Sequence, residues 1–296
     1  MAKSIGIVGG GALGTLLASR LLATGADVRV VARSGSRHEA LKRNHPSLRT
    51  GSEFELVSDV EVVFLCVKAY HTRDVARSLA ALGLKETTVC SLQNGWGHME
   101  HLDQTLPHLP LLAGATSLGA YLDEGGSLHA TERGTTVLAP WRPDDLRRAE
   151  RAADLLRSGA GLNVEVRPNA RAVLWRKLVL NSAVNPVTAL ARCTNGVLLQ
   201  EPALFEIARQ AAREAARVGR KLGVLDPDFD PDEALAAILR ETAANLSSMR
   251  EDLSRGRRTE VEEITGSVVR LAGEAGVPAP VQGALLTLMR AAERRL

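Results

Sequence analysis

The chain has few aromatic residues, few cysteines and no long hydrophobic run. Aromatic side chains make up 3% of its 296 residues, which leaves few flat surfaces on which nucleic-acid bases could stack. The 3 cysteines show no C-x-x-C spacing, so we expect buried thiols in a reducing cytoplasm, with neither disulfides nor a metal site. No run of 18 apolar residues is present, and the first residues enter a strand pattern at once. We therefore expect no membrane span, no signal peptide and a cytoplasmic protein.

Charge is also nearly balanced along the chain. The 37 basic and 34 acidic side chains give a net charge of +3 and are interspersed. The densest basic cluster, residues 255–258, is more typical of a solvated loop than of a nucleic-acid contact, so no nucleic-acid partner is expected. The length exceeds that of one ordinary domain, and 45% hydrophobic residues can fill two cores.

The N-terminal residues carry the pattern of a dinucleotide-binding turn. Residues 5–8 form a buried-strand pattern that runs into G-x-G-x-x-G, and a helical pattern follows. Gly9 would permit a tight turn, Gly11 would let the backbone approach a pyrophosphate, and Gly14 would let the helix pack closely on the strand. The positive end of the helix would then face the phosphates. We predict cofactor binding at Gly9, Gly11, Ala12, Leu13 and Gly14.

The end of the second strand predicts which dinucleotide binds. An NAD site usually carries Asp or Glu there, which accepts a hydrogen bond from the ribose 2′-hydroxyl. This chain has Ala32 and then Arg33, with Arg37 and His38 close behind and no carboxylate. An arginine fork matches a phosphate in charge and geometry. We therefore predict NADPH, with Arg33 on the ribose phosphate; the alternative is that Arg33 is a solvated residue at a strand end.

The first half continues as alternating strands and helices, which indicates a doubly wound, mostly parallel sheet. Buried-strand patterns at residues 60–67 and 88–92 lead into Lys68 and Asn94. Ligands of open α/β sheets bind at the carboxyl ends of strands, so both residues are candidates for cofactor or substrate contacts. Asn94 precedes Gly95, and this pair also fits a simple turn.

Shorter elements complete this half of the chain. We predict three short strands, at residues 113–122, 127–131 and 135–138, that extend the sheet as an antiparallel or mixed edge. An amphipathic helix is predicted at residues 144–157 and a final strand at residues 162–167. The domain boundary is placed after residue 167. This gives a Rossmann domain over residues 1–167 and an all-α domain over residues 168–296.

The first helix of the second half carries the most informative motif. Lys177, Asn181 and Asn185 follow one another at intervals of four within an apolar run, so they lie on one helix face. An ammonium and two carboxamides suit a small, oxygen-rich substrate, whereas the alternative is a solvated polar stripe. Pro186 should end or kink this helix and leave Asn185 at a local break, where its amide can turn toward a ligand.

Two later helix starts are marked by capping residues. Asp230 is followed by proline and by Glu233, which is typical of a first helical turn. Thr259 stands three residues before Glu262, which predicts a capping box with reciprocal side-chain bonds.

Together these motifs resemble the ketopantoate reductase (2-dehydropantoate 2-reductase) family over nearly the whole chain. The most specific matches are the glycine turn and four segments, namely Q-N-G-W-G at 93–97, W-R-K-L-x-x-N-x-x-x-N-P at 175–186, N-L-S-S-M at 245–249 and T-E at 259–260. Trp96 departs from the smaller residue of many relatives and would narrow the pocket.

The resemblance implies a Rossmann domain, an all-helical C-terminal domain and NADPH as the hydride donor. The reaction would reduce a branched 2-keto acid, most simply ketopantoate to pantoate in pantothenate and coenzyme A biosynthesis. Lys177 would act as general acid in a cleft between the domains, Glu260 would hold the lysine and the cofactor, and Asn94 would bridge cofactor and substrate. Lys68 and Arg33 would lie on the phosphate and ribose side of the cofactor.

The resemblance also assigns the substrate contacts. Asn181, Asn185 and Ser248 would bind the hydroxyl, ketone and carboxylate of the substrate, and Asn245, from the same segment as Ser248, is assigned to it as well. Reduction of a ketone places negative charge on its oxygen, which a lysine can neutralise while delivering a proton. A carboxylate beside that lysine would keep it protonated in a partly dry cleft.

Two other functions fit parts of the pattern. A β-hydroxyacid-type dehydrogenase acting on another small acid also pairs a Rossmann domain with helices and a Lys-x-x-x-Asn motif. It is disfavoured because we expect no counterpart there of residues 247–249 and 259–260. A non-catalytic NADPH sensor would not need a proton donor such as Lys177. The helical domain could also bury an apolar face in a homodimer.

Overall fold

The computed structural model describes residues 4–33, 35–123, 125–130 and 134–295, and the chain groups into two compact units. The sheet unit comprises Met1–Gln93 and His98–Val173, and the helical unit comprises Asn94–Gly97 and Leu174–Leu296. The boundary predicted after residue 167 stays a prediction. The sequence had not indicated that the short loop Asn94–Gly97 groups with the helices.

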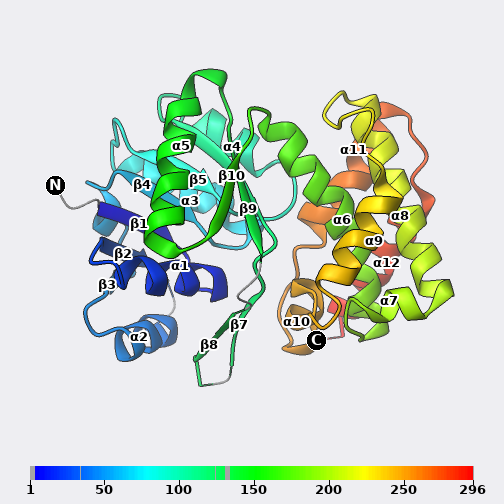
Figure 1. Cartoon of the computed structure of the whole chain (residues 1–296), viewed down its shortest axis with the longest axis horizontal. Helices are drawn as coiled ribbons and strands as arrows, with labels where there is room; N and C mark the ends of the chain where they lie inside the picture. Colours follow the sequence, from blue (N-terminus) through cyan, green and yellow to red (C-terminus); the bar gives the residue numbers. More distant parts are fainter. Residues whose placement is uncertain (1–3, 34, 124, 131–133, 296) are drawn as a thin grey trace. The chain divides into compact units, whose positions relative to one another are not determined.

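Eight strands of the sheet unit form one sheet in the order β10-β9-β6-β5-β4-β1-β2-β3 (Figure 1). Neighbouring strands are parallel except for the pair β6 and β9. The run β3-β2-β1-β4-β5-β6 is the strand order of a dinucleotide-binding Rossmann sheet, which confirms the predicted fold class. The strands are β1 Ser4–Val8, β2 Asp27–Val31, β3 Arg49–Gly51, β4 Val62–Leu65, β5 Thr88–Ser91, β6 Leu111–Thr116, β9 Thr135–Pro140 and β10 Asn163–Val166.

One edge of this unit differs from the prediction. The strand expected at residues 113–122 is divided into β6 and β7 (Ala120–Leu122), and β7 pairs with β8 (Leu128–Ala130) in a separate antiparallel hairpin. The division arises because the hydroxyl of Thr116 accepts a hydrogen bond from the N–H of Leu118, at 3.2 Å, and turns the chain out of the sheet. The strand predicted at residues 127–131 also extends beyond the described residues at its last position.

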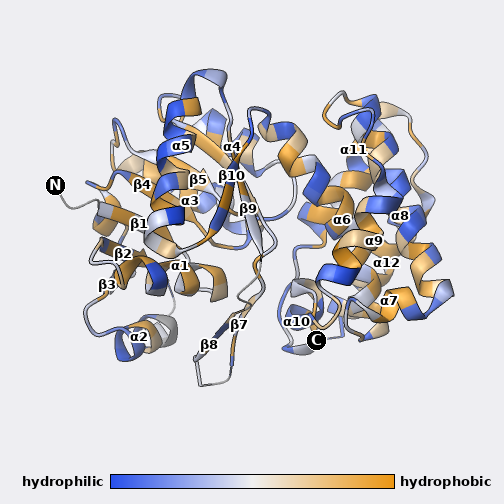
Figure 2. Ribbon diagram, viewed as in Figure 1, coloured by the Kyte–Doolittle hydropathy of each residue, from blue (hydrophilic) through white to orange (hydrophobic). Residues whose placement is uncertain are grey.

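Helices cover both faces of the sheet (Figure 1). Alternate residues of each strand face opposite sides, so Ile5 and Ile7 of β1 share one core with Leu17 and Ala149. These two core partners belong to α1 (Ala12–Leu22) and α5 (Leu146–Asp154). Figure 2 shows the strands as largely hydrophobic, whereas α5 presents many hydrophilic residues. The remaining helices of this unit are α2 Gly35–Asn44, α3 Thr72–Ala81 and α4 His98–Thr105.

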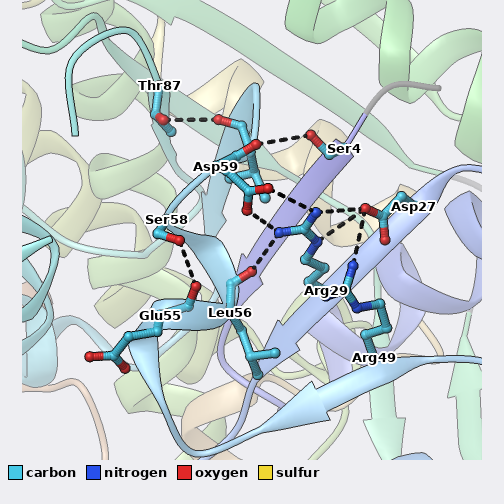
Figure 3. A network of polar contacts seen from close by, with 10 residues as sticks. Ser4, Asp27, Arg29, Arg49, Glu55, Leu56, Ser58, Asp59 and Thr87 are labelled. Atoms are coloured by element: carbon cyan, nitrogen blue, oxygen red, sulfur yellow. Dashed lines mark hydrogen bonds and ion pairs between the residues drawn. The ribbon is translucent and has the colours of Figure 1, made fainter. Parts of the chain in front are cut away.

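An ion network centred on Arg29 joins β2 to the segment that precedes β4 (Figure 3). The buried side chain of Arg29 on β2 pairs with Asp27 at 2.8 Å and with Asp59, and donates to the carbonyl of Leu56 at 3.1 Å. The hydrogen bond from Arg29 is the main cause that lowers the pKa of Asp59 below its usual value. The arginine is fully partnered, as a buried cation must be, so we assign it to stability.

The helical unit is built around α8, which packs against α7, α9, α11 and α12. A buried polar group ties three of its helices together, because Gln282 Nε2 donates to Ser182 Oγ and to the carbonyl of Ala211, both at 2.9 Å. Glu214 accepts from the N–H of Gln282 at 2.9 Å and so caps the start of α12. No described helix is long and apolar enough to cross a membrane. The helices are α6 Ala170–Ala191, α7 Val197–Gln200, α8 Pro202–Lys221, α9 Pro231–Glu241, α10 Ser248–Ser254, α11 Ser267–Ala275 and α12 Pro280–Glu293.

The helix end predicted at Pro186 is wrong. The helix α6 continues through Pro186 to Ala191, with Asn185 buried inside it, and the alternative of a kink stays a prediction. A proline inside a helix costs roughly 3 kcal/mol because it removes one backbone hydrogen bond. The surrounding core offsets that cost, since most side chains of this stretch are buried, and the hydroxyl of Thr188 adds a bond to the carbonyl of Val184 at 2.8 Å.

The two predicted helix caps have different outcomes. Asp230 caps α9 by accepting from two N–H groups of the first turn, as predicted. The capping box at Thr259 is wrong in its partners. The hydroxyl of Thr259 accepts from the N–H two residues later, whereas Glu262 pairs with Arg290 and the N–H of Thr259 donates to Glu293 at 2.7 Å. The acceptor for the N–H of Thr259 is therefore Glu293 of α12, and not Glu262 as a capping box would require.

Candidate functional site

The glycine turn of the sheet unit has the geometry that the motif predicts. Gly9 has φ +121°, and a Cβ atom there would lie 2.8 Å from the backbone of Cys66. A Cβ on Gly14 would lie 1.9 Å from the carbonyl oxygen of Gly9, so α1 approaches the turn as closely as a glycine allows. At Gly11, by contrast, a Cβ would meet no atom within 4 Å. Gly9 and Gly14 are thus needed for packing, whereas Gly11 faces open space.

The start of α1 fits the pyrophosphate of a dinucleotide. Gly11 is the N-terminal cap residue, no side chain caps the helix, and the first turn contains no acidic residue. The first N–H groups of a helix have no partner within it and form its positive end. A phosphate could therefore approach over Gly11 and accept hydrogen bonds from this turn, at Ala12, Leu13 and Gly14.

Two neighbouring strand ends of the sheet unit are fixed by Gln93. This buried side chain donates to the hydroxyl of Thr72 at 2.9 Å and to the carbonyl of Lys68 at 3.4 Å, and it accepts from Ser91 Oγ at 3.0 Å. Lys68 is half-buried and follows β4, which is paired with β1. The loop that carries Lys68 is therefore held at the same end of the sheet as the glycine turn.

Arg33 lies where the second strand ends. Ala32 is buried, and its N–H donates to the carbonyl of Gly51 at 2.8 Å, whereas Arg33 is exposed. Since β2 is paired with β1, this exposed guanidinium leaves the sheet at the end that also bears the glycine turn. This position agrees with a role on the ribose side of a cofactor, and the role itself stays a prediction.

The helical unit holds a lysine whose pKa is strongly changed. Lys177 is half-buried on α6, and burial lowers its pKa to about 8, while the charge of Glu260 acts in the opposite direction. Glu260 is itself buried. A lysine with this pKa is still mostly protonated at neutral pH but gives up its proton far more readily than an ordinary lysine.

Asn94 completes this group from a distant part of the sequence. Its Nδ2 donates to Glu260 Oε2 at 3.2 Å, although the two residues are 166 positions apart. The structure therefore brings together Asn94, Lys177 and Glu260, three of the residues predicted for the site, within the helical unit. An ammonium with a carboxylate beside it, and an amide that orients this carboxylate, is equipped to deliver a proton.

The loop Asn94–Gly97 is attached to the helical unit mainly through its backbone. The N–H of Trp96 donates to the carbonyl of Glu263 at 2.9 Å, and Ser267 Oγ donates to the carbonyl of Trp96 at 3.4 Å. Gly95 has φ +90°, and a Cβ there would lie 2.4 Å from the carbonyl oxygen of Glu263. The acceptor lies in a π-helical turn, Glu262–Gly266, and such turns are frequent at functional sites.

Sequence reasoning missed two features of this region. The indole of Trp96 packs edge-on against that of Trp175, with ring centroids 4.8 Å apart and planes at 79°. Burial raises the pKa of Glu263, and the nearby charge of Glu260 acts in the same direction. The glycines on both sides of Trp96 were a usable signal for the first feature, because they indicate a backbone held close to another element.

The four predicted substrate residues lie on α6 and around the start of α10. Asn181 is half-buried, one turn after Lys177, and Asn185 is buried. Thr188 Oγ1 donates to Ser247 Oγ at 2.8 Å, which fixes the start of α10 to α6 one turn after Asn185. Ser248 is the first residue of α10 and is exposed, and the half-buried Asn245 accepts a bond from Asn195 through its carbonyl. The substrate contacts of Asn181, Asn185, Asn245 and Ser248 stay predictions.

A Rossmann sheet with a dinucleotide turn, together with a helical unit in which a half-buried lysine feels the charge of a buried glutamate, defines a class of two-domain nucleotide-dependent oxidoreductases. Residues 5–143 match the family model for ketopantoate reductase PanE/ApbA, and residues 169–293 match the model for its C-terminal part. The chain belongs to the ketopantoate reductase family.

Individual relatives cover the whole chain. The 2-dehydropantoate 2-reductase of Archaeoglobus fulgidus is 36% identical over 300 residues, which cover 99% of both chains. Among solved structures, the PanE/ApbA family ketopantoate reductase of Ralstonia eutropha JMP134 aligns with a TM-score of 0.86 and 26% identity over 99% of both chains. D-mandelate dehydrogenase, solved with NADH and anilino(oxo)acetate, aligns with a TM-score of 0.89 over 99% of this chain and 98% of its own, but at 23% identity this likeness shows the fold alone.

Proposed function

We propose that this protein is an NADPH-dependent reductase of a branched 2-keto acid, with ketopantoate as the substrate and pantoate as the product. The observation that carries the proposal is the group formed by Asn94, Lys177 and Glu260 in the helical unit. The choice of ketopantoate as substrate is supported by the 36% identity of this chain to the 2-dehydropantoate 2-reductase of Archaeoglobus fulgidus.

The proton comes from Lys177. When bound at the glycine turn, NADPH would supply a hydride to the carbonyl carbon of the keto acid. The carbonyl oxygen then gains negative charge, and the ammonium of Lys177 stabilises this charge and transfers a proton to it. With a pKa of about 8, roughly nine in ten Lys177 side chains carry that proton at pH 7. Glu260 keeps the lysine charged between turnovers, and solvent returns the proton.

The substrate is held by uncharged polar groups in this proposal. Asn181, Asn185 and Ser248, with Asn245, bind its hydroxyl, ketone and carboxylate oxygens. Amide and hydroxyl groups donate to such oxygens without competing with Lys177 for the proton.

The preference for NADPH rests on Arg33. The exposed guanidinium after β2 can pair with a ribose phosphate in two parallel hydrogen bonds, and no carboxylate follows this strand within the next three residues to accept from a ribose hydroxyl. Lys68, Asn94 and Glu260 are proposed as further cofactor contacts.

Turnover with a panel of keto acids tests this function. The purified chain would be assayed with NADPH and, separately, ketopantoate, 2-ketoisovalerate, pyruvate and phenylglyoxylate, with the product identified by mass spectrometry. We expect ketopantoate to give the highest kcat/KM and pantoate as product. If none of these acids causes NADPH to be consumed, the proposed reductase activity is ruled out. If phenylglyoxylate gives the highest kcat/KM, it replaces ketopantoate as the proposed substrate.

A further inference from the structure

We propose that Trp96 is a positioning residue, whose indole holds the loop Asn94–Gly97 on the helical unit so that Asn94 meets Glu260. This inference rests on the proposed function, since it concerns the carboxylate that accompanies Lys177. Trp96 itself touches neither the carboxylate nor the lysine in the contacts described, and its effect passes through Asn94.

The loop needs a side-chain anchor because the backbone contacts that we describe for it lie at Gly95 and Trp96. Gly95 and Gly97 both have positive φ, at +90° and +96°, and glycine loses more conformational freedom on ordering than any other residue. Around Gly97 a Cβ would meet no atom within 4 Å, so packing does not restrain that end of the loop. The side chain between the two glycines is the indole of Trp96.

The indole is seated against a fixed partner. Trp175 is fully buried, and its Nε1 donates to the carbonyl of Ala215 at 3.0 Å, so its ring cannot move without breaking that bond. The edge-on contact of the two rings, with centroids 4.8 Å apart, is a favoured aromatic geometry. Trp175 lies two residues before Lys177 on α6, so the anchor and the proton donor share one rigid element.

The bond that depends on this anchor tolerates little movement. Asn94 Nδ2 and Glu260 Oε2 are already 3.2 Å apart, at the long end of the usual range for a hydrogen bond. The hydrogen bonds to the backbone of Trp96 and the close approach of Gly95 all involve Glu263 or Ser267. The contact of the indole with Trp175 adds a restraint from a different element, α6.

A direct test follows the side chain of Asn94 by NMR. Its Nδ2 protons would be assigned by their loss in Asn94→Ala, and their exchange with water measured in wild type, Trp96→Leu and Trp96→Phe. We expect exchange to be at least about 10-fold faster in Trp96→Leu, because the loss of an aromatic pair and its packing is worth about that factor. Trp96→Phe keeps an edge-on ring and should exchange like wild type. The matched control is Trp141→Leu, which removes another buried indole in the sheet unit and should leave Asn94 unchanged.

A double-mutant cycle then tests the route of the effect on catalysis. Asn94→Ala should lower kcat/KM for ketopantoate by about 10- to 150-fold, the range for loss of a hydrogen bond to a charged group. In the wild-type background, Trp96→Leu should lower kcat/KM by part of this factor. When Asn94 is already alanine, Trp96→Leu should lower kcat/KM by less than about 2-fold. The variant Trp96→Phe should have a kcat/KM close to that of wild type.

The outcomes separate this inference from the proposed function. If wild type reduces no keto acid, the proposed function fails, and the NMR measurement still decides the role of Trp96. Unchanged exchange of the Asn94 amide in Trp96→Leu would overturn the inference even in an active reductase. Additive losses in the cycle would also overturn it, since Trp96 would then act by another route.

Discussion

Gly219 lies directly against Trp175 in the helical unit: a Cβ on Gly219 would lie 2.0 Å from the indole Nε1 of Trp175. The two residues belong to α8 and α6. Glycine at this position of α8 therefore lets the buried indole reach the carbonyl of Ala215. The contact fixes α6 two residues before Lys177.

Gly219→Ala should destabilise the protein. In an open helix the change would gain up to about 1 kcal/mol in helix propensity. Here overpacking against the indole should cost about 1–3 kcal/mol and outweigh that gain, because the indole is already hydrogen-bonded to Ala215 on the same helix and packs against Trp96. The free energy of unfolding in urea would be compared with that of Gly273→Ala in α11, where a Cβ meets no atom within 4 Å. Stabilisation by both substitutions would show that α6 and α8 are not in this contact.

Lys177→Ala should lower kcat by at least about 10²-fold, the usual contribution of a positioned general acid. Affinity for NADPH should change little, because the glycine turn and Arg33 are expected to hold the cofactor. Lys177→Arg should rescue poorly, since a guanidinium keeps the charge but hardly releases a proton. Steady-state kinetics and NADPH titration of the folded variants are the measurements, and near-normal turnover of the alanine variant would exclude Lys177 as the acid.

The pH dependence of kcat/KM should report the lowered pKa of Lys177. The general acid must be protonated, so kcat/KM should be flat below about pH 7 and fall as pH rises through about 8. Glu260 acts to raise the pKa of Lys177, so Glu260→Gln should move this fall to lower pH. The glutamine keeps an oxygen that can accept from Asn94, which isolates the effect of charge. A shift to higher pH in this variant would contradict the pairing of the two residues.

Arg33→Ala should weaken NADPH selectively. A hydrogen-bonded ion pair is worth roughly 1.5–3 kcal/mol, which corresponds to about 10- to 150-fold in affinity. NADH lacks the ribose phosphate, so its affinity should stay nearly unchanged. Fluorescence titration with each cofactor provides the comparison, with Arg49→Ala as a control on the neighbouring strand, where the exposed arginine pairs with Asp27. Equal losses for NADPH and NADH in Arg33→Ala would show that Arg33 does not select between them.

Much of the sheet unit could be predicted from the sequence, because its patterns depend on residues that are close together in the chain. The tasks of Gly9, Gly11 and Gly14 follow from spacing alone, because the turn and the helix start lie within one continuous segment. The edge was harder, since the hydroxyl of Thr116 turns the chain within a run that otherwise has strand composition. At Pro186 the local propensity of proline predicts the end of a helix. The helix continues because burial of most side chains around this position outweighs that propensity.

The sequence by itself determined the Rossmann sheet, the helical second half and the polar face that carries Lys177, because periodicity and glycine spacing act over a few residues. Tertiary structure decided that Asn94 joins Glu260, that Trp96 packs on Trp175, and that Glu293 rather than Glu262 serves Thr259. Each of these contacts joins segments between 34 and 166 positions apart. Partners at such separations are selected by packing of whole elements, and a linear pattern does not contain that information.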